Sequence, residues 1–311
     1  IISGLLFDQN DFIDSVYRIE NRIIEPVLEK SFDWRIFLTA STLMFSSFIG
    51  FDAIAQTGNE AKNPTKNIPK AILLAIFIVS LYYILFTISV YNIIPWNFVA
   101  DEALTKDITA PGLLSYVLPP FWGTLIIIGA AIALINDLPA MILSVSRLMF
   151  AWSKDNIFPE KISEIHPKFN TPHRAIVYVG VVASIGAFGS HFAGDFFLGI
   201  DIMVTSMMIN FLLMCITLLT IKRVNPVLYN NINIVKNRAI QLLIGYLGSF
   251  IIFIFLVIHT FKDLSSNVDE WYFHSTYIYL IVMILASLYF VIRLNRVKTK
   301  NIDTFKQLPL E

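Results

Sequence analysis

Seven long apolar stretches, each of about 20 residues, limit what this 311-residue chain can fold into. A helix needs about 20 apolar residues to cross the hydrocarbon core of a bilayer. Only 15% of the residues are charged, whereas a soluble domain usually carries about a quarter. The sequence therefore predicts an all-α polytopic membrane protein. The predicted spans are Ile36–Gln56, Ile72–Ile94, Phe121–Met149, Ala175–Gly189, Phe196–Ile221, Ile240–Thr260 and Tyr272–Ile292.

Positive charge is distributed unevenly between the segments that join these spans. Cytoplasmic loops of membrane proteins carry an excess of Lys and Arg. Most of the 23 Lys and Arg residues follow the first, third and fifth spans or lie in the tail, whereas the opposite loops hold only Lys106 and Lys262. We therefore expect a multi-pass plasma-membrane protein whose N-terminal end is extracellular and whose C-terminal tail is cytoplasmic.

The stretch before the first span contains two further predicted elements. Ile1–Phe7 resembles the end of another hydrophobic segment. Apolar residues then recur at helical spacing, which predicts an amphipathic helix over Phe12–Val27 on the outer surface. A covering helix without a role in transport is the favoured interpretation. An odd number of spans after an external end indicates the C-terminal part of a longer chain.

The first span has a polar interruption near its centre. Ser46 and Ser47 precede Gly50, and glycine costs about 1 kcal/mol in a helix relative to alanine. Asp52 follows, and a carboxylate at this depth costs roughly 2.5–3.5 kcal/mol on insertion scales. A broken helix leaves backbone groups that a solute can satisfy. Two interpretations stay open: a break that binds a solute, and a glycine that only permits close packing, with Asp52 paired to another helix.

Two longer motifs extend this pattern. The first motif begins at the polar interruption and continues through the following loop into the start of the second span. Its matching residues are Phe48, Gly50, Phe51, Asp52, Glu60, Asn63, Pro64, Lys66, Ile68, Pro69, Ala71 and Ile72. The second, S-R-x-x-[FY]-x-x-[AS]-[RK]-D-[GN]-x-[FL]-P followed by T-P, is matched from Ser146 to Pro159 and at Thr171-Pro172. With both motifs, most of the chain resembles the amino acid–polyamine–organocation (APC) transporter family.

The resemblance implies a LeuT-like (APC) transporter fold, which has two inverted five-helix repeats and two extra helices. The seven spans would be helices six to twelve of the family. Residues 36–221 would form the second repeat, 222–292 the two additional helices and 293–311 a cytoplasmic tail. Residues 1–35 would hold the end of a preceding helix and the extracellular segment. The first repeat, which receives the substrate carboxylate in the family, would be missing.

The resemblance also implies a function. The protein would be a permease, working as a symporter or an antiporter, that moves amino acids or related amines by alternating access. The substrate amine would be held at the unwound part of the first span. The substrate-binding residues implied there are Ser46, Ser47, Phe48, Ile49, Gly50, Phe51 and Asp52.

Other polar residues within the spans are candidates for the solute path or for ion coupling. They are Asn136, Asp137, Ser144, Asp201 and Thr205. Asn136 is partly a family feature, whereas Asp137 is not expected from the family. For Ser144, a hydrogen bond to the preceding helical turn is favoured over an ion contact. The coupling ion would be H⁺ or Na⁺, and no cofactor or metal site is expected, because no His/Cys cluster has ligand spacing.

Several other classes of function receive little support. A net charge of zero gives no support to a nucleic-acid partner. An enzyme is not expected, since the sequence has no nucleophile elbow or metal-protease motif, and no channel filter is visible. The alternative left open is a transporter-fold receptor or sensor that binds its ligand without net transport.

The expected partners are the small-molecule substrate, membrane lipid and the missing N-terminal half of the chain. The identity of the substrate, the coupling ion and the oligomeric state stay open.

Overall fold

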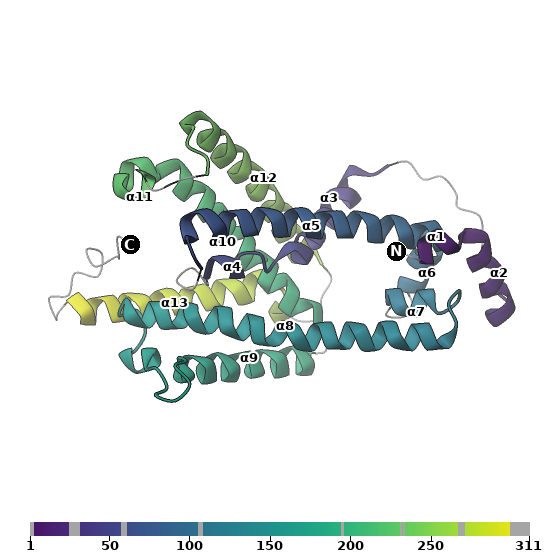
Figure 1. Cartoon of the computed structure of the whole chain (residues 1–311), viewed down its shortest axis with the longest axis horizontal. Coiled ribbons are helices and arrows are strands. Elements are labelled where there is room, and N and C mark those ends of the chain that lie inside the picture. Colours follow the sequence, from purple (N-terminus) through teal and green to yellow (C-terminus); the bar gives the residue numbers. More distant parts are fainter. Residues whose placement is uncertain are drawn as a thin grey trace. The chain divides into compact units, whose positions relative to one another are not determined.

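The computed structural model describes residues 3–24, 32–56, 61–104, 108–193, 196–230, 232, 234–266 and 271–298. These residues form helices joined by turns, with no strand among them (Figure 1). The α-helices are α1 (Ser3–Leu6), α2 (Gln9–Glu20), α3 (Trp34–Met44), α4 (Ala53–Gln56), α5 (Pro64–Ile93), α6 (Trp96–Ala103), α7 (Ala110–Leu114), α8 (Pro120–Lys154), α9 (His173–Ala193), α10 (Phe196–Val224), α11 (Pro226–Asn230), α12 (Arg238–Ser265) and α13 (Ser275–Lys298). The 3₁₀ helices are η1 (Phe45–Phe48), η3 (Glu160–Ser163) and η4 (Trp271–Phe273).

Among the described residues, seven helical segments are long and apolar enough to cross a membrane, which confirms the number and order of the predicted spans. They are Trp34–Gln56, Pro64–Ile93, Phe121–Lys154, His173–His191, Leu198–Val224, Arg238–Ser265 and Ser275–Asn295. The second begins earlier than expected, at Pro64, because proline suits the first turn of a helix and Asn63 before it has a left-handed backbone (φ 50°). The third continues past the expected end at Met149 to Lys154.

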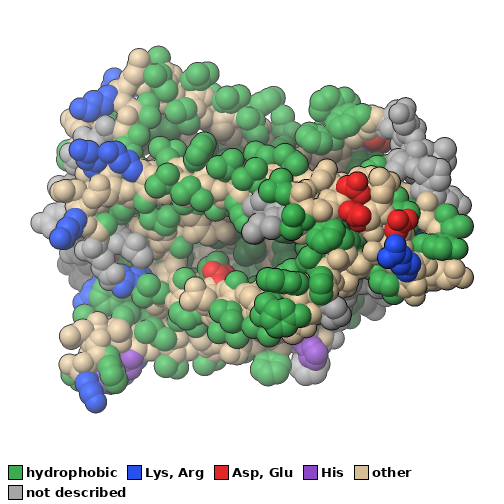
Figure 2. Space-filling model, turned by 45° about the vertical axis from the view of Figure 1, so that its right-hand side comes forward, with side chains coloured by type: hydrophobic (Ala, Val, Ile, Leu, Met, Phe, Trp, Pro, Cys, Tyr) green, Lys and Arg blue, Asp and Glu red, His purple; other side chains and the backbone are tan. Residues whose placement is uncertain are grey.

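Apolar side chains are exposed along these helices. Leu134, Ile185 and Phe250 are 72%, 66% and 63% exposed, and Figure 2 shows apolar side chains over much of the face in view. Water would oppose such extensive apolar exposure. A hydrocarbon environment removes that cost, so the surface fits helices that lie in a lipid bilayer.

The chain divides into two compact units, of which the first comprises residues 1–32 and 73–140. Its buried core joins α2 to the end of α5 and to α6 and α7. The core residues are Phe12, Val16, Ile93, Ile94, Phe98, Leu113 and Leu114. The Phe12 ring packs edge-on against Phe98 and Tyr116, with centroids 5.1 and 5.4 Å apart. Burying one such side chain contributes about 1.5–3 kcal/mol, which is enough to hold a short helix in place.

Helix α2 is shorter than the sequence suggested. The Asp8 side chain caps its first turn, and the helix ends at Glu20 because Asn21 adopts the left-handed conformation (φ 52°). The prediction that one amphipathic helix continues through Ile23 is therefore wrong, and Ile23 is 76% exposed. Val27, where that prediction ended, lies outside the described residues.

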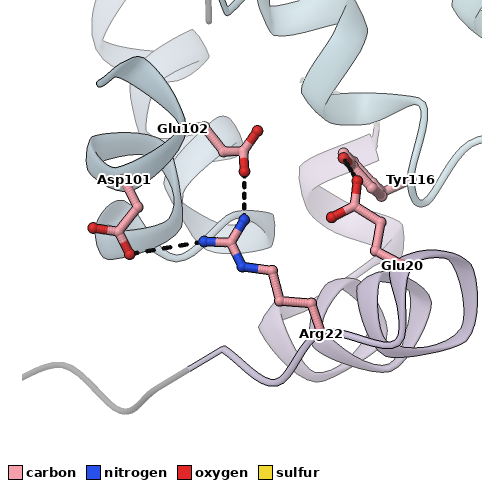
Figure 3. A network of polar contacts seen from close by, with 5 residues as sticks. All are labelled: Glu20, Arg22, Asp101, Glu102 and Tyr116. Carbon is pink, nitrogen blue, oxygen red and sulfur yellow. Dashed lines mark hydrogen bonds and ion pairs between the residues drawn. The ribbon is translucent and has the colours of Figure 1, made fainter. Parts of the chain in front are cut away.

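A network of polar side chains borders the core of the first unit (Figure 3). The Arg22 guanidinium lies 2.5 Å from the Glu102 carboxylate and 4.0 Å from Asp101, and it also lies over the Phe98 ring. The Tyr116 hydroxyl donates to the Glu20 carboxylate at 2.5 Å. Burial and this hydrogen bond raise the pKa of Tyr116 to about 12, so the hydroxyl remains a donor at neutral pH.

The second unit comprises residues 33–72 and 141–311, and its most extensive helix contact is between α10 and α12. Two glycines on α12 face α10 where the helices approach. A Cβ atom on Gly245 would lie 2.5 Å from Leu219 Cδ2, and one on Gly248 would lie 2.9 Å from the Cys215 sulfur. Small residues at a helix interface let helices pack closely in a membrane, where dispersion contacts replace the hydrophobic effect.

Arg238 fixes the same pair of helices at one end. Its guanidinium donates to the carbonyl oxygens of Leu218 and Leu219 on α10, at 3.0 and 2.6 Å, and to the Gln241 side chain at 3.0 Å. A cation near the C-terminal end of a helix is favoured by the helix dipole. The first residue of α12 therefore anchors that helix to α10.

The second sequence motif forms the connection from α8 to α9. The Ser153 hydroxyl donates to the Pro159 carbonyl, and the Trp152 and Phe158 rings stack with centroids 5.8 Å apart. Arg293 on α13 donates to the Phe158 carbonyl at 3.1 Å. These contacts account for the Ser, Phe and Pro positions of the motif as parts of a compact turn.

Candidate functional site

The first span is interrupted where the sequence predicted. Helix α3 ends at Met44, η1 covers Phe45–Phe48, and α4 begins only at Ala53. Between them, Ile49 is extended (φ −68°, ψ 138°) and Gly50 has a φ of 125°. Figure 1 shows the change of direction between α3 and α4. Residues with a side chain rarely adopt a φ of 125°, so glycine at position 50 allows the chain to turn here.

The interruption leaves polar backbone groups outside the helical pattern. The Ile49 N–H donates to the Ser46 carbonyl, and the Gly50 N–H donates to the Asp52 carboxylate at 3.2 Å. Within the described part of the chain, the N–H groups of Phe51 and Asp52 have no acceptor and the Ile49 carbonyl has no donor. A half-buried segment with unpaired donors and an acceptor is suited to a polar ligand or to water.

The hydroxyl at the start of the break is engaged locally. Ser46 Oγ donates to the Leu43 carbonyl at 2.8 Å, so the backbone of this residue is better placed for a ligand than its side chain. Ser47 is exposed, whereas Phe48 and Asp52 are half-buried. The seven predicted substrate residues thus lie on one continuous segment, and their contact with a substrate remains a prediction.

An aromatic residue that the sequence did not single out lies beside the break. Phe211 on α10 stacks on Phe51, with centroids 5.4 Å apart and planes 14° apart. It also meets Phe45 edge-on at 6.0 Å. Nothing in the sequence marks Phe211 among 26 phenylalanines, because the contact depends on how α10 packs against η1.

The other predicted path residues have different surroundings. The Ser144 hydroxyl donates to the Gln56 side chain rather than to the preceding turn of its own helix. Thr205 is buried and donates to the Asp201 carbonyl at 3.0 Å, so its hydroxyl is used within α10. Asn136 and Asp137 are exposed on the part of α8 that belongs to the first unit. Roles in a solute path or in coupling stay predictions for these residues.

A cavity of about 750 Å³ opens in the second unit beyond α4. Its wall combines apolar side chains with polar groups and with Arg147, Lys154 and Asp155. The lining residues are Gln56, Leu143, Ser146, Arg147, Phe150, Ala151, Lys154, Asp155, Ile165, Asn170, Thr171, Pro172, Ile176 and Leu228. Such a volume accommodates a small molecule. Among the described residues, no group of three or more His, Cys, Asp and Glu could hold a metal ion.

The seven apolar helical segments found in the described part of the chain, one of them interrupted at a polar segment, define a multi-pass helical membrane protein. Residues 28–302 match the sequence profile described as amino acid permease. The chain therefore belongs to the amino acid permease family, which is part of the APC group that its motifs resemble.

Individual relatives agree with this assignment. The chain is 27% identical over 172 residues to the branched-chain amino acid permease BcaP of Bacillus subtilis (strain 168), a match that covers 52% of this chain and 36% of the relative. It is 30% identical over 149 residues to the methylthioribose transporter of the same organism, covering 48% and 31%. It is 29% identical over 154 residues to cationic amino acid transporter 4, vacuolar, of Arabidopsis thaliana, covering 49% and 24%.

The matched region is about a third or less of the length of these curated relatives. No solved structure shows a significant match to the chain. These matches establish the family of the chain, but they do not establish the activity of the whole protein.

Proposed function

We propose that the full-length protein is a secondary transporter that moves amino acids or related amines across a membrane by alternating access. The observation that carries this proposal is the interrupted first span, where the N–H groups of Phe51 and Asp52 and the Ile49 carbonyl lack partners within the described chain. Membership in the amino acid permease family supports the substrate class. The relatives named above for branched-chain and cationic amino acids support it further.

The substrate amine would be held by carbonyl oxygens of the segment from Ser46 to Gly50. An ammonium group is a donor with three N–H bonds, and an unpaired carbonyl such as that of Ile49 is a matching acceptor. Phe48 and Phe51 would form the apolar wall, with Phe51 held in place by Phe211. Asp52, through its contact with the Gly50 N–H, would hold the shape of the break.

The remaining features of the transporter are part of the same proposal. The fold would be LeuT-like, with residues 36–221 as the second inverted repeat, 222–292 as the extra helix pair and 293–311 as the tail. The positive-charge distribution supports an extracellular N-terminal end, a cytoplasmic tail and a plasma-membrane location. Coupling to H⁺ or Na⁺ would use polar residues on the spans, with Asn136, Asp137, Ser144, Asp201 and Thr205 as candidates.

Uptake of amino acids into liposomes by the full-length protein tests this proposal. Replacing Asp52 with alanine should reduce uptake roughly threefold to tenfold, because one hydrogen bond that shapes the break is lost. The matched control is Asp14→Asn, which removes an exposed carboxylate from α2 and should leave uptake unchanged. Undiminished uptake by Asp52→Ala, or no uptake of any amino acid or amine by the unaltered protein, would contradict the proposal.

A further inference from the structure

The two halves of the interrupted span are attached to different helices. The first half, α3 with η1, packs against α12 and α10. Phe51 within the break stacks on Phe211 of α10. The second half, α4, is tied to α8 by the hydrogen bond from the Ser144 hydroxyl to Gln56 Oε1. The segment Ile49–Asp52 therefore separates two anchored ends.

The hydrogen bond of Ser144 differs from those of three other hydroxyl residues on the predicted spans. Ser41, Ser184 and Thr205 each donate to a carbonyl four residues earlier in their own helix. Such local bonds satisfy the hydroxyl without linking two helices. Ser144, which is only 5% exposed, instead reaches a side chain on another helix. This hydroxyl therefore links α8 to α4.

The contact also lies at the edge of the 750 Å³ cavity. Gln56 is the last residue of α4 and lines the cavity, and Ser146 and Arg147, just beyond Ser144 on α8, line it as well. A displacement of α4 away from α8 would change the opening of this cavity. The hydrogen bond is thus placed to control how open this cavity is.

We propose that the Ser144–Gln56 hydrogen bond is a latch that holds the second half of the interrupted span against α8 and must break and re-form during each transport cycle. The proposal rests on the transport function proposed above and assigns positioning roles to two residues outside the break. Ile49–Asp52 then acts as the hinge, because it lies between the two anchored halves and outside both helices.

Cysteine labelling tests the latch without any substrate. A cysteine is placed at Ala151, an exposed residue of the cavity wall, in full-length protein whose Cys215 and any other cysteine have been replaced. The rate of its reaction with a water-soluble maleimide reports how open the cavity is. Ser144→Ala should raise this rate roughly threefold to tenfold, the range that one interhelical hydrogen bond in a membrane supports.

Three comparisons separate a latch from general destabilisation. Gln56→Ala should raise the labelling rate as much as Ser144→Ala does. The double variant should show no further increase in that rate, because both substitutions remove the same hydrogen bond. Ser144→Thr should restore the slow rate, since it keeps the hydroxyl. Ser184→Ala on α9, which removes a local hydrogen bond, should leave the rate unchanged.

The results distinguish this proposal from the proposed function. An unchanged labelling rate in Ser144→Ala and Gln56→Ala, or effects that simply add in the double variant, would overturn the latch even in a protein that transports amino acids. Coupled effects in a protein that takes up no amino acid would instead leave the hydrogen-bonded link in place and overturn the transport function.

Discussion

Replacing Gly50 with alanine should reduce amino acid uptake by roughly tenfold or more, although the added methyl group would touch nothing. A Cβ atom at this position has no neighbour within 4 Å among the described residues, so a steric clash with them does not explain the effect. It comes from the backbone, because a φ of 125° is a conformation that residues with a side chain rarely adopt. Holding such a residue there costs of order 1–3 kcal/mol, and relaxing that strain would reshape the break.

A matched glycine isolates this backbone effect. Gly180 in α9 also has open space where a methyl group would be added, but it lies in an ordinary helix, so Gly180→Ala should leave uptake unchanged. Initial uptake rates into liposomes, normalised to the amount of inserted protein, measure both variants. Equal uptake by Gly50→Ala and Gly180→Ala would show that the unusual conformation of Gly50 has no part in transport.

Replacing Arg22 with methionine should lower the free energy of unfolding of the protein by about 2 kcal/mol. Glu102 is only 4% exposed and lies 2.5 Å from the Arg22 guanidinium, so the change removes this cation from beside a buried carboxylate (Figure 3). Breaking a fully buried ion pair in this way costs about 3–5 kcal/mol. The Arg22 side chain is 40% exposed, and solvent screening therefore places the expected loss below that range.

Two further variants show whether the buried charge is the cause. Arg18, four residues earlier and within α2, is exposed, so Arg18→Met should change stability little. Adding Glu102→Gln to Arg22→Met should recover part of the loss, because the buried group is then neutral. Unfolding in micelles that contain increasing amounts of a denaturing detergent measures each difference. Equal losses for Arg22→Met and Arg18→Met would contradict the importance of this ion pair.

Local chemistry made much of the structure predictable. The number of spans follows from the length of apolar stretches, which the bilayer thickness fixes. The interruption follows from Gly50 beside Ser46, Ser47 and Asp52, since a helix rarely places such residues together within a membrane. The α8–α9 turn follows from a motif whose Ser and Pro contact one another only six residues apart.

Features that depend on contacts between distant residues could not be predicted. The partner of Ser144 is 88 residues away on α4, and helical back-bonding was the more common alternative for its hydroxyl. Phe211 is placed beside Phe51 by helix packing rather than by any local pattern. The end of α2 at Glu20 was missed for another reason: the apolar spacing continues, whereas the left-handed conformation of Asn21 stops the helix.

Equilibrium binding to the purified full-length protein tests most directly whether the interrupted span holds an amine. A labelled amino acid would be displaced by the same unlabelled amino acid and by its deaminated analogue, which keeps the carboxylate and the side chain. We predict that the deaminated analogue binds roughly tenfold to a hundredfold more weakly, because a charged hydrogen bond to the break is lost. Gly50→Ala should remove most of this difference. Equal displacement by both compounds, or full discrimination retained in Gly50→Ala, would contradict an amine site at Ser46–Asp52.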